Sequence, residues 1–373
     1  MLRAESSARA KHKRENLSDA APHQKPHQRR SGRIEWIDAA RGVAVVLVVV
    51  GHYFMFVASP SMSEPVSRVW SPILDQLATI RMPLLFVLSG MLVSARITAG
   101  WRDPKTAQRF RVTSYIYLIW VAAYALVWRL LPEGLPYRFA DIGDTISQVW
   151  HPDTPLWFIF ALSVYTALFA SLSSIPKWLV LTAALAFGMW SATLPGDRGQ
   201  IFWLHILTYS MFFAAGVYAR TLFVWFANVR KWPTALGLLA LGLTLVPSAT
   251  SLQVSLGVLS IAHSVAGFLY VCAAIWSISV MCRSKRFARV SSWFGTRTLP
   301  LYVLHMPVIF FLIEFHKLVP LSWFPGEWAW PITGAGVVLL GCLGAEWILR
   351  RARFDYLFDA PSWVRRDEPV RSL

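Results

Sequence analysis

Long apolar stretches alternate with short polar connections through most of this chain. The apolar stretches approach 20 residues, the length that an α-helix needs to cross the hydrocarbon core of a bilayer. We delimit ten spans, at 42–59, 73–95, 113–131, 155–173, 177–194, 201–226, 233–250, 255–281, 296–315 and 328–349. The pattern predicts an all-α fold, a polytopic membrane bundle of about ten transmembrane helices.

The two ends of the chain differ from its centre. Residues 1–32 are rich in Lys, Arg, His, Ser and Pro and contain no apolar run, which predicts a disordered basic tail. We expect residues 33–350 to form one transmembrane domain and residues 351–373 to form a C-terminal tail. The loops between the spans are too short to hold a separate soluble domain.

The basic residues predict the orientation of the spans. With the N-terminus in the cytoplasm, 28 of the 36 Lys and Arg residues fall on the inner side and six on or near the outer side. Cytoplasmic loops of membrane proteins carry such an excess, so we expect both termini in the cytoplasm. The net charge of +16 then reflects orientation, and a nucleic-acid partner is not expected.

The first span carries an ionisable residue in its middle. Arg41 precedes the span, and His52 follows eleven residues later. At about 1.5 Å per residue these steps cover roughly 16 Å, about half of the hydrocarbon thickness. A polar side chain at that depth is costly and marks a candidate functional site. The alternative for His52 is a structural histidine that is hydrogen-bonded to a neighbouring helix.

Four stretches carry the candidate chemistry. They are Asp38 to Arg41 with His52, Arg81-Met82-Pro83 with Ser89-Gly90, Leu156-Trp157-Phe158, and Tyr302 with His305 and Pro307. Together, and in this order, they resemble the acyltransferase-3 family of membrane O-acyltransferases, over about residues 33–350. Arg81 stands where many members carry His, which is similar to the subset that includes fucose 4-O-acetylase-like proteins.

The resemblance implies a polysaccharide-modifying enzyme of the bacterial inner (plasma) membrane. Such an enzyme moves an acyl group, most simply acetyl, from cytoplasmic acyl-CoA to a hydroxyl of a glycan or lipid-linked sugar. We assign His52 as the general base, with His305 assisting from a similar depth. Arg41 would hold the phosphates of the donor, oriented by Asp38 one helical turn earlier.

Three further residues are candidates for binding the acceptor. Arg81 would contact the acceptor or the charge that develops in the transition state, Trp157 would stack on a sugar face, and Glu314 would meet the sugar two turns beyond His305. Each has a structural alternative. Arg41 can be a positive-inside arginine at the membrane surface, Arg81 can form a structural ion pair, and Trp157 can belong to an interfacial aromatic belt.

Two other functions fit parts of the pattern. Intramembrane His and Arg also suit a sugar or anion transporter or flippase, although the paired inverted halves typical of many transporters are not evident. An inactive membrane scaffold is the third possibility. The sequence contains no phosphate-binding loop, dinucleotide fingerprint or zinc spacing, so no metal is implied and acyl-CoA is the expected co-substrate.

Overall fold

The computed structural model describes residues 35–132, 135, 137, 141–194, 202–229, 232–251 and 255–365. This part of the chain is helical and contains no β-strand. The predicted basic tail at 1–32 lies outside the described residues, as do Arg138, Arg198, Arg230 and Lys231 of the charge analysis.

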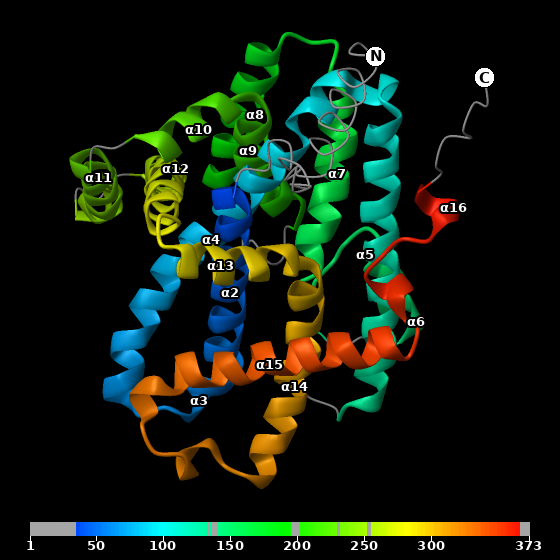
Figure 1. The fold of residues 1–373 in the computed structure, drawn as a ribbon. Coiled ribbons are helices and arrows are strands. Elements are labelled where there is room, and N and C mark those ends of the chain that lie inside the picture. The colour runs from blue at the N-terminus through cyan, green and yellow to red at the C-terminus, as the bar shows by residue number, and fades with distance from the viewer. Residues whose placement is uncertain are drawn as a thin grey trace, which may run out of the picture. The chain divides into compact units, whose positions relative to one another are not determined.

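The helices follow one another with short connections (Figure 1). In chain order they are α2 (Glu35–Tyr53), a π-helical segment (Phe54–Ala58), α3 (Ser59–Ser61), α4 (Glu64–Ala99), α5 (Pro104–Leu130), α6 (Ile142–Ser147), α7 (Trp157–Ser171), α8 (Lys177–Thr193), α9 (Phe202–Tyr218), α10 (Arg220–Asn228), α11 (Trp232–Ser251), α12 (Leu256–Met281), α13 (Lys285–Thr296), α14 (Thr298–Leu318), α15 (Trp330–Arg351) and α16 (Ser362–Arg365). Short 3₁₀ turns occupy Gly100–Arg102, Leu321–Trp323, Glu327–Ala329 and Asp355–Leu357.

The helical, membrane-spanning class predicted from the apolar pattern is confirmed. Among the described residues, six helices are long and apolar enough to cross a membrane, or seven if one bent pair counts as a span. Each of the ten predicted ranges contains a helix, but several of these helices are shorter than a full span. The count of ten and the cytoplasmic position of the termini therefore stay predictions.

The predicted span at 201–226 is wrong as a single helix. The chain bends by 73° between α9 and α10, where Ala219 leaves helical geometry. Arg220 begins the second helix. A straight continuation would carry this charge farther along an apolar helix, where charges are costly.

Two predicted inner loops are also largely helical. α4 continues to Ala99 and α5 begins at Pro104, so most of the 96–112 connection belongs to helices. Asp103 caps α5 by accepting a hydrogen bond from the Lys105 amide at 3.0 Å, and Pro104 suits the first helical turn. The predicted loop at 283–291 lies mostly in α13, an amphipathic helix.

Close backbone contact fixes α13 across the start of α2. A Cβ on Gly42 would lie 2.0 Å from the Ser291 carbonyl oxygen, and one on Gly295 would lie 1.9 Å from the Asp38 carbonyl oxygen. Glycine at both positions lets the two backbones meet. This crossing holds the Asp38–Arg41 turn in place at the head of α2.

α4 and α9 approach each other in the same way. A Cβ on Gly90 would lie 2.3 Å from the Phe213 carbonyl oxygen, and one on Gly216 would lie 2.1 Å from the Val87 carbonyl oxygen. Gly90 of the Ser89-Gly90 pair is thus a site of close helix approach. The contact brings the Arg81 segment of α4 and the aromatic face of α9 together.

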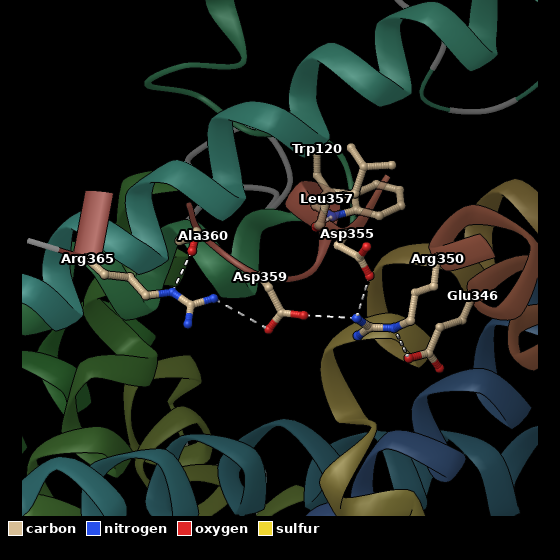
Figure 2. A network of polar contacts seen from close by, with 8 residues as sticks. All are labelled: Trp120, Glu346, Arg350, Asp355, Leu357, Asp359, Ala360 and Arg365. Carbon is tan, nitrogen blue, oxygen red and sulfur yellow. Dashed lines mark hydrogen bonds and ion pairs between the residues drawn. The ribbon is translucent and has the colours of Figure 1, made fainter. Parts of the chain in front are cut away.

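The segment after α15 docks on α5. The Arg111 Nε donates to the Val364 carbonyl oxygen at 3.1 Å, and the Trp120 Nε1 donates to the Leu357 carbonyl oxygen at 2.6 Å. Figure 2 shows Arg350 of α15 between three carboxylates, with Arg365 completing the group at Asp359. The part of the predicted C-terminal tail up to Arg365 is therefore packed against the helices.

Candidate active site

His52 and His305 meet in the interior, as their predicted depths require. The Nε2 of His305 lies 3.2 Å from the Nδ1 of His52, and the ring centroids are 5.0 Å apart. His305 has no exposed surface, whereas His52 is partly accessible. The expectation that the two histidines reach a similar depth is confirmed.

The backbone assigns the protons of this pair in its neutral state. The Nδ1 of His305 lies 2.5 Å from the Tyr302 carbonyl oxygen. A carbonyl only accepts, so Nδ1 carries the proton and the Nε2 of His305 carries a lone pair. The Nδ1 of His52 is then the donor in the contact between the rings, and His52 also forms a hydrogen bond with the Val48 backbone. This leaves the Nε2 of His52 unprotonated and able to take a proton.

A cavity of about 210 Å³ adjoins His52, and we call it the reaction cavity. Its lining comes from α2, α4, α7, α9 and α14 and includes His52, Arg81, Trp157, His205, Tyr209 and Tyr302. Three of the residues singled out from the sequence, His52, Arg81 and Trp157, thus share one cavity. His305 contacts this cavity through His52 and does not line it.

Arg81 reaches His52 because the intervening residue on α2 is glycine. The Nη1 of Arg81 donates to the Leu47 carbonyl oxygen at 3.4 Å. A Cβ on Gly51 would lie 1.6 Å from the same nitrogen, so any other residue there would displace the guanidinium. Asp75, Tyr209 and Tyr302 lie near enough to interact with this charge. The cation therefore faces a polar pocket instead of lipid.

Trp157 forms an aromatic wall of the reaction cavity. Its ring lies 4.6 Å from His205 and 5.5 Å from Tyr209, measured between centroids. Phe86 supports it from α4 at 5.6 Å. Trp157 is the first residue of α7, and its ring is turned inward. This placement favours a stacking surface over a place in an interfacial belt.

A second cavity of about 310 Å³ lies at the Arg41 end of α2, and we call it the donor cavity. Arg41 and Arg109 line it together with Ser89, Thr113 and Thr298. The Nη2 of Arg41 donates to the Thr298 Oγ1 at 2.7 Å, and its Nη1 lies 4.0 Å from the Asp38 Oδ1. Asp38 thus accompanies Arg41 as predicted, at the outer limit of an ion pair.

Arg109 gives the donor cavity a second cation. The charges that act on it in the described structure are those of Arg41 and Arg96, and no carboxylate ion pair to Arg109 is found among the described residues. Two guanidinium groups that line one cavity, with a single acid, Asp38, at the outer limit of an ion pair, form a site for a polyanion such as a phosphate chain.

Tyr302 stands between the two cavities. Its side chain lines both of them, and its hydroxyl donates to the Pro155 carbonyl oxygen. The contact joins α14 to the Leu156-Trp157-Phe158 stretch at the start of α7. The same residue supplies the carbonyl that fixes the His305 proton, so one residue links the wall and the histidine pair.

Glu314 lies apart from this arrangement. Its Oε1 accepts a hydrogen bond from the Lys317 Nζ at 2.6 Å, on the same helix. It lines neither the reaction cavity nor the donor cavity. Its suggested part in acceptor binding stays a prediction without support from these contacts.

Sequence reasoning missed Tyr209 and gave little weight to His205 and Arg109. Tyr209 lies within an apolar, aromatic helix, where it is indistinguishable from a core residue. A polar residue four positions before it, His205, was the available signal, because residues at this spacing share one helix face. Arg109 lies in the connection expected between the spans 73–95 and 113–131, and only the extension of α5 back to Pro104 places it on a helix beside the donor cavity.

The sequence model of the acyltransferase-3 family, described as an acyltransferase domain, matches residues 34–348. The match covers most of the chain, so this protein belongs to the acyltransferase-3 family and is a membrane acyltransferase by descent. The resemblance drawn from the four stretches is confirmed at the level of the family. No curated protein matches the chain.

Proposed function

We propose that this protein is a membrane O-acyltransferase that moves an acyl group, most simply acetyl, from acyl-CoA to a hydroxyl of a glycan or lipid-linked sugar. The observation that carries the proposal is the pairing of a cavity lined by two arginines with an aromatic cavity that holds His52 and Arg81, on either side of Tyr302. The first suits the phosphates of coenzyme A, and the second suits a sugar.

The donor would enter at the Arg41 end of α2. Arg41 and Arg109 would hold its phosphates, with Asp38 and Thr298 orienting Arg41. The pantetheine arm separates these phosphates from the thioester, so the thioester can extend along the donor cavity towards Tyr302. Movement of the Tyr302 ring would then bring the thioester carbonyl to His52. We place this donor in the cytoplasm, following the distribution of basic residues.

The acceptor would occupy the reaction cavity. Trp157 would stack on a face of the sugar, and Arg81 would bind the sugar or the oxyanion of the tetrahedral intermediate. The acceptor hydroxyl lies within reach of His52 in such a pose. Glu314 has no place in this pose, since it pairs with Lys317.

The acyl transfer requires one base where the thioester carbonyl and the acceptor hydroxyl meet. The Nε2 of His52 takes the proton of the acceptor hydroxyl. At the same time, the oxygen of this hydroxyl forms a bond to the carbonyl carbon of the thioester. The carbon–sulfur bond then breaks, and the imidazolium returns the proton to the leaving thiolate of coenzyme A. An ester and free coenzyme A result. His305 accepts the His52 Nδ1 proton in a hydrogen bond and so holds the ring in the reactive tautomer.

The test uses purified full-length protein in detergent with deuterated acetyl-CoA and glycan released from the host cell surface. We expect free coenzyme A to appear in proportion to deuterated acetyl ester on the glycan, measured by a thiol reagent and by mass spectrometry. The ester must depend on the protein and be absent with heat-inactivated protein.

Two outcomes of this experiment would contradict the proposal. If acetyl-CoA is not consumed, while proteoliposomes containing the protein take up sugars or anions, the acyltransfer proposal is refuted in favour of a transporter. Consumption of acetyl-CoA without any acylated acceptor would contradict the assignment of the reaction cavity to a sugar.

A further inference from the structure

A third cavity adjoins the reaction cavity and takes no part in the chemistry described above. It measures about 230 Å³ and is lined by residues of α4, α9, α11 and α12. Its polar lining includes Gln76, Thr79, Thr208, His263, Ser264 and Tyr270. We call it the side cavity.

The lining of the side cavity is polar but uncharged. Among the residues that the structure describes, no Asp, Glu, Lys or Arg contributes to it, and the aromatic rings of Tyr209, Phe212 and Tyr270 form part of its wall. Hydroxyl, amide and imidazole groups beside aromatic faces are the chemistry that recognises sugars. The donor cavity, with its two arginines, has the opposite character.

Three polar groups of this wall donate their protons to carbonyl oxygens of their own helices. The Ser264 hydroxyl donates to the Ser260 carbonyl oxygen at 3.0 Å, and the Thr79 hydroxyl donates to the Gln76 carbonyl oxygen at 2.7 Å. The Nδ1 of His263 donates to the Leu259 carbonyl oxygen at 2.9 Å, which leaves a lone pair on Nε2 in the neutral ring. Their donor protons are thus committed to their own helices.

Proline adds one more acceptor to the same wall. Pro83 lies in the side cavity and inside α4. Because proline has no amide hydrogen, the carbonyl four residues earlier, on Thr79, loses its usual helical donor. The wall therefore presents acceptors beside the donor groups of Gln76 and Tyr270, and the hydroxyl groups of a sugar can both donate and accept.

Tyr209 connects the side cavity with the reaction cavity, because its ring lines both. Trp157 lies on its reaction-cavity side at 5.5 Å, and Phe212 lies on its side-cavity side at 6.1 Å. Both cavities also take residues from the same stretch of α4, with Ala78 and Arg81 in one and Thr79 in the other. Two linked sugars could thus lie on either side of one tyrosine.

We propose that the side cavity is a second sugar subsite, which binds the residue of the acceptor next to the one that is acylated. The inference rests on the proposed function, and it adds that the acceptor is an oligosaccharide or longer glycan. Monosaccharides would fill the reaction cavity alone and would bind more weakly.

The test compares two variants that each add one cysteine to α12, His263→Cys and Ile261→Cys. Both side chains are exposed, with Ile261 at 40%, but only His263 lines the side cavity. Side chains that are two positions apart on an α-helix, such as those at 261 and 263, point to nearly opposite faces. Each variant in detergent is treated with a water-soluble, cationic methanethiosulfonate, and the wild type, whose three cysteines are free, provides the background.

We expect the cysteine at position 263 to react about tenfold faster than the one at 261, a difference of ~1.4 kcal/mol in activation free energy. A pool of di- to tetrasaccharides, released from the host surface glycan by mild acid, should slow the reaction at 263. Monosaccharides at the same concentration should slow it much less, and neither should affect position 261.

Equal labelling of the two positions would overturn the proposal, because the side cavity would then not be a separate aqueous site. Labelling at 263 that the oligosaccharide pool does not slow would overturn it as well. The readout is thiol labelling in the absence of acyl-CoA. Failure of the second-subsite proposal is therefore distinguishable from failure of acyl transfer, which is measured as free coenzyme A.

Discussion

Three ring nitrogens and one carbonyl decide which atom of the site can act as a base. The Tyr302 carbonyl holds the proton of His305 on Nδ1, and the 3.2 Å contact then holds the proton of His52 on its own Nδ1. The reactive nitrogen of His52 is thereby specified by a residue that lies one helical turn before His305. His305 is a positioning residue in this account, and His52 is the residue that touches substrate.

This relation predicts different effects for two substitutions of His305. In His305→Gln the amide oxygen stands near the position of Nε2 and can still accept the His52 proton, whereas His305→Ala removes the acceptor. We expect the alanine variant to lose on the order of 10²-fold in kcat and the glutamine variant to retain most of it. The KM for acyl-CoA should not change in either. Equal loss in both variants would contradict the positioning role.

The residue scale also shows where sequence reasoning succeeds. The position of His52 in the middle of its span can be inferred from the sequence, because the fixed rise of an α-helix turns the eleven-residue step from Arg41 into a distance along the helix axis. Arg81 and Trp157 are readable because charge and indole are unusual beside apolar runs. Tyr209 cannot be singled out from the sequence, because its distinguishing feature is that it lines two cavities. These cavities depend on how α4, α9 and α12 pack.

At the scale of elements, two segments that the apolar pattern did not predict support the donor cavity. One is α13, whose glycine contact with α2 supports the Asp38–Arg41 turn. The other is the segment after α15, which places Phe358 in the lining of the donor cavity. Both were expected as loop or tail, because an amphipathic helix and a docked segment lack a long apolar run.

Arg350 holds this last segment in place and provides the prediction at this scale. Its guanidinium lies 3.0 Å from Glu346, 3.3 Å from Asp355 and 2.9 Å from Asp359, and it covers the Phe358 ring at 5.0 Å. In Arg350→Gln we expect the KM for acyl-CoA to rise about three- to fivefold, since a partly exposed ion pair contributes up to ~1 kcal/mol. Turnover at saturating donor should stay near that of the wild type.

Arg351→Gln is the matched control for Arg350→Gln. Arg351 is the neighbouring residue, and its guanidinium contacts the Trp347 ring at 5.6 Å, away from the docked segment. The difference between the two variants should shrink at high salt, where charge interactions are screened. If both raise the KM to the same extent, or neither does, the network does not support the donor cavity.

At the scale of the whole molecule, the proposed acyl transfer uses two cavities that share Tyr302, with His52 in one of them. The match of the acyltransferase-3 family over residues 34–348 gives the reaction class, and the cavities suggest how donor and acceptor are kept apart until they react. The helical class and the family were predictable from apolar runs and four short motifs. The number of spans stays a prediction, because several helices in the predicted ranges are shorter than a full span and α9 meets α10 at a bend of 73°.

The most direct test of the central claim is acyl-CoA turnover by His52→Ala, with His316→Ala as the control. His316 lies near the end of α14 and lines none of the three cavities, and its Nδ1 donates to the Val319 carbonyl oxygen. Both variants should insert into membranes and elute like the wild type. We expect His316→Ala to release coenzyme A at the wild-type rate and His52→Ala to lose at least about 10²–10⁴-fold. Turnover by His52→Ala at the rate of the control would contradict the assignment of His52 as the base.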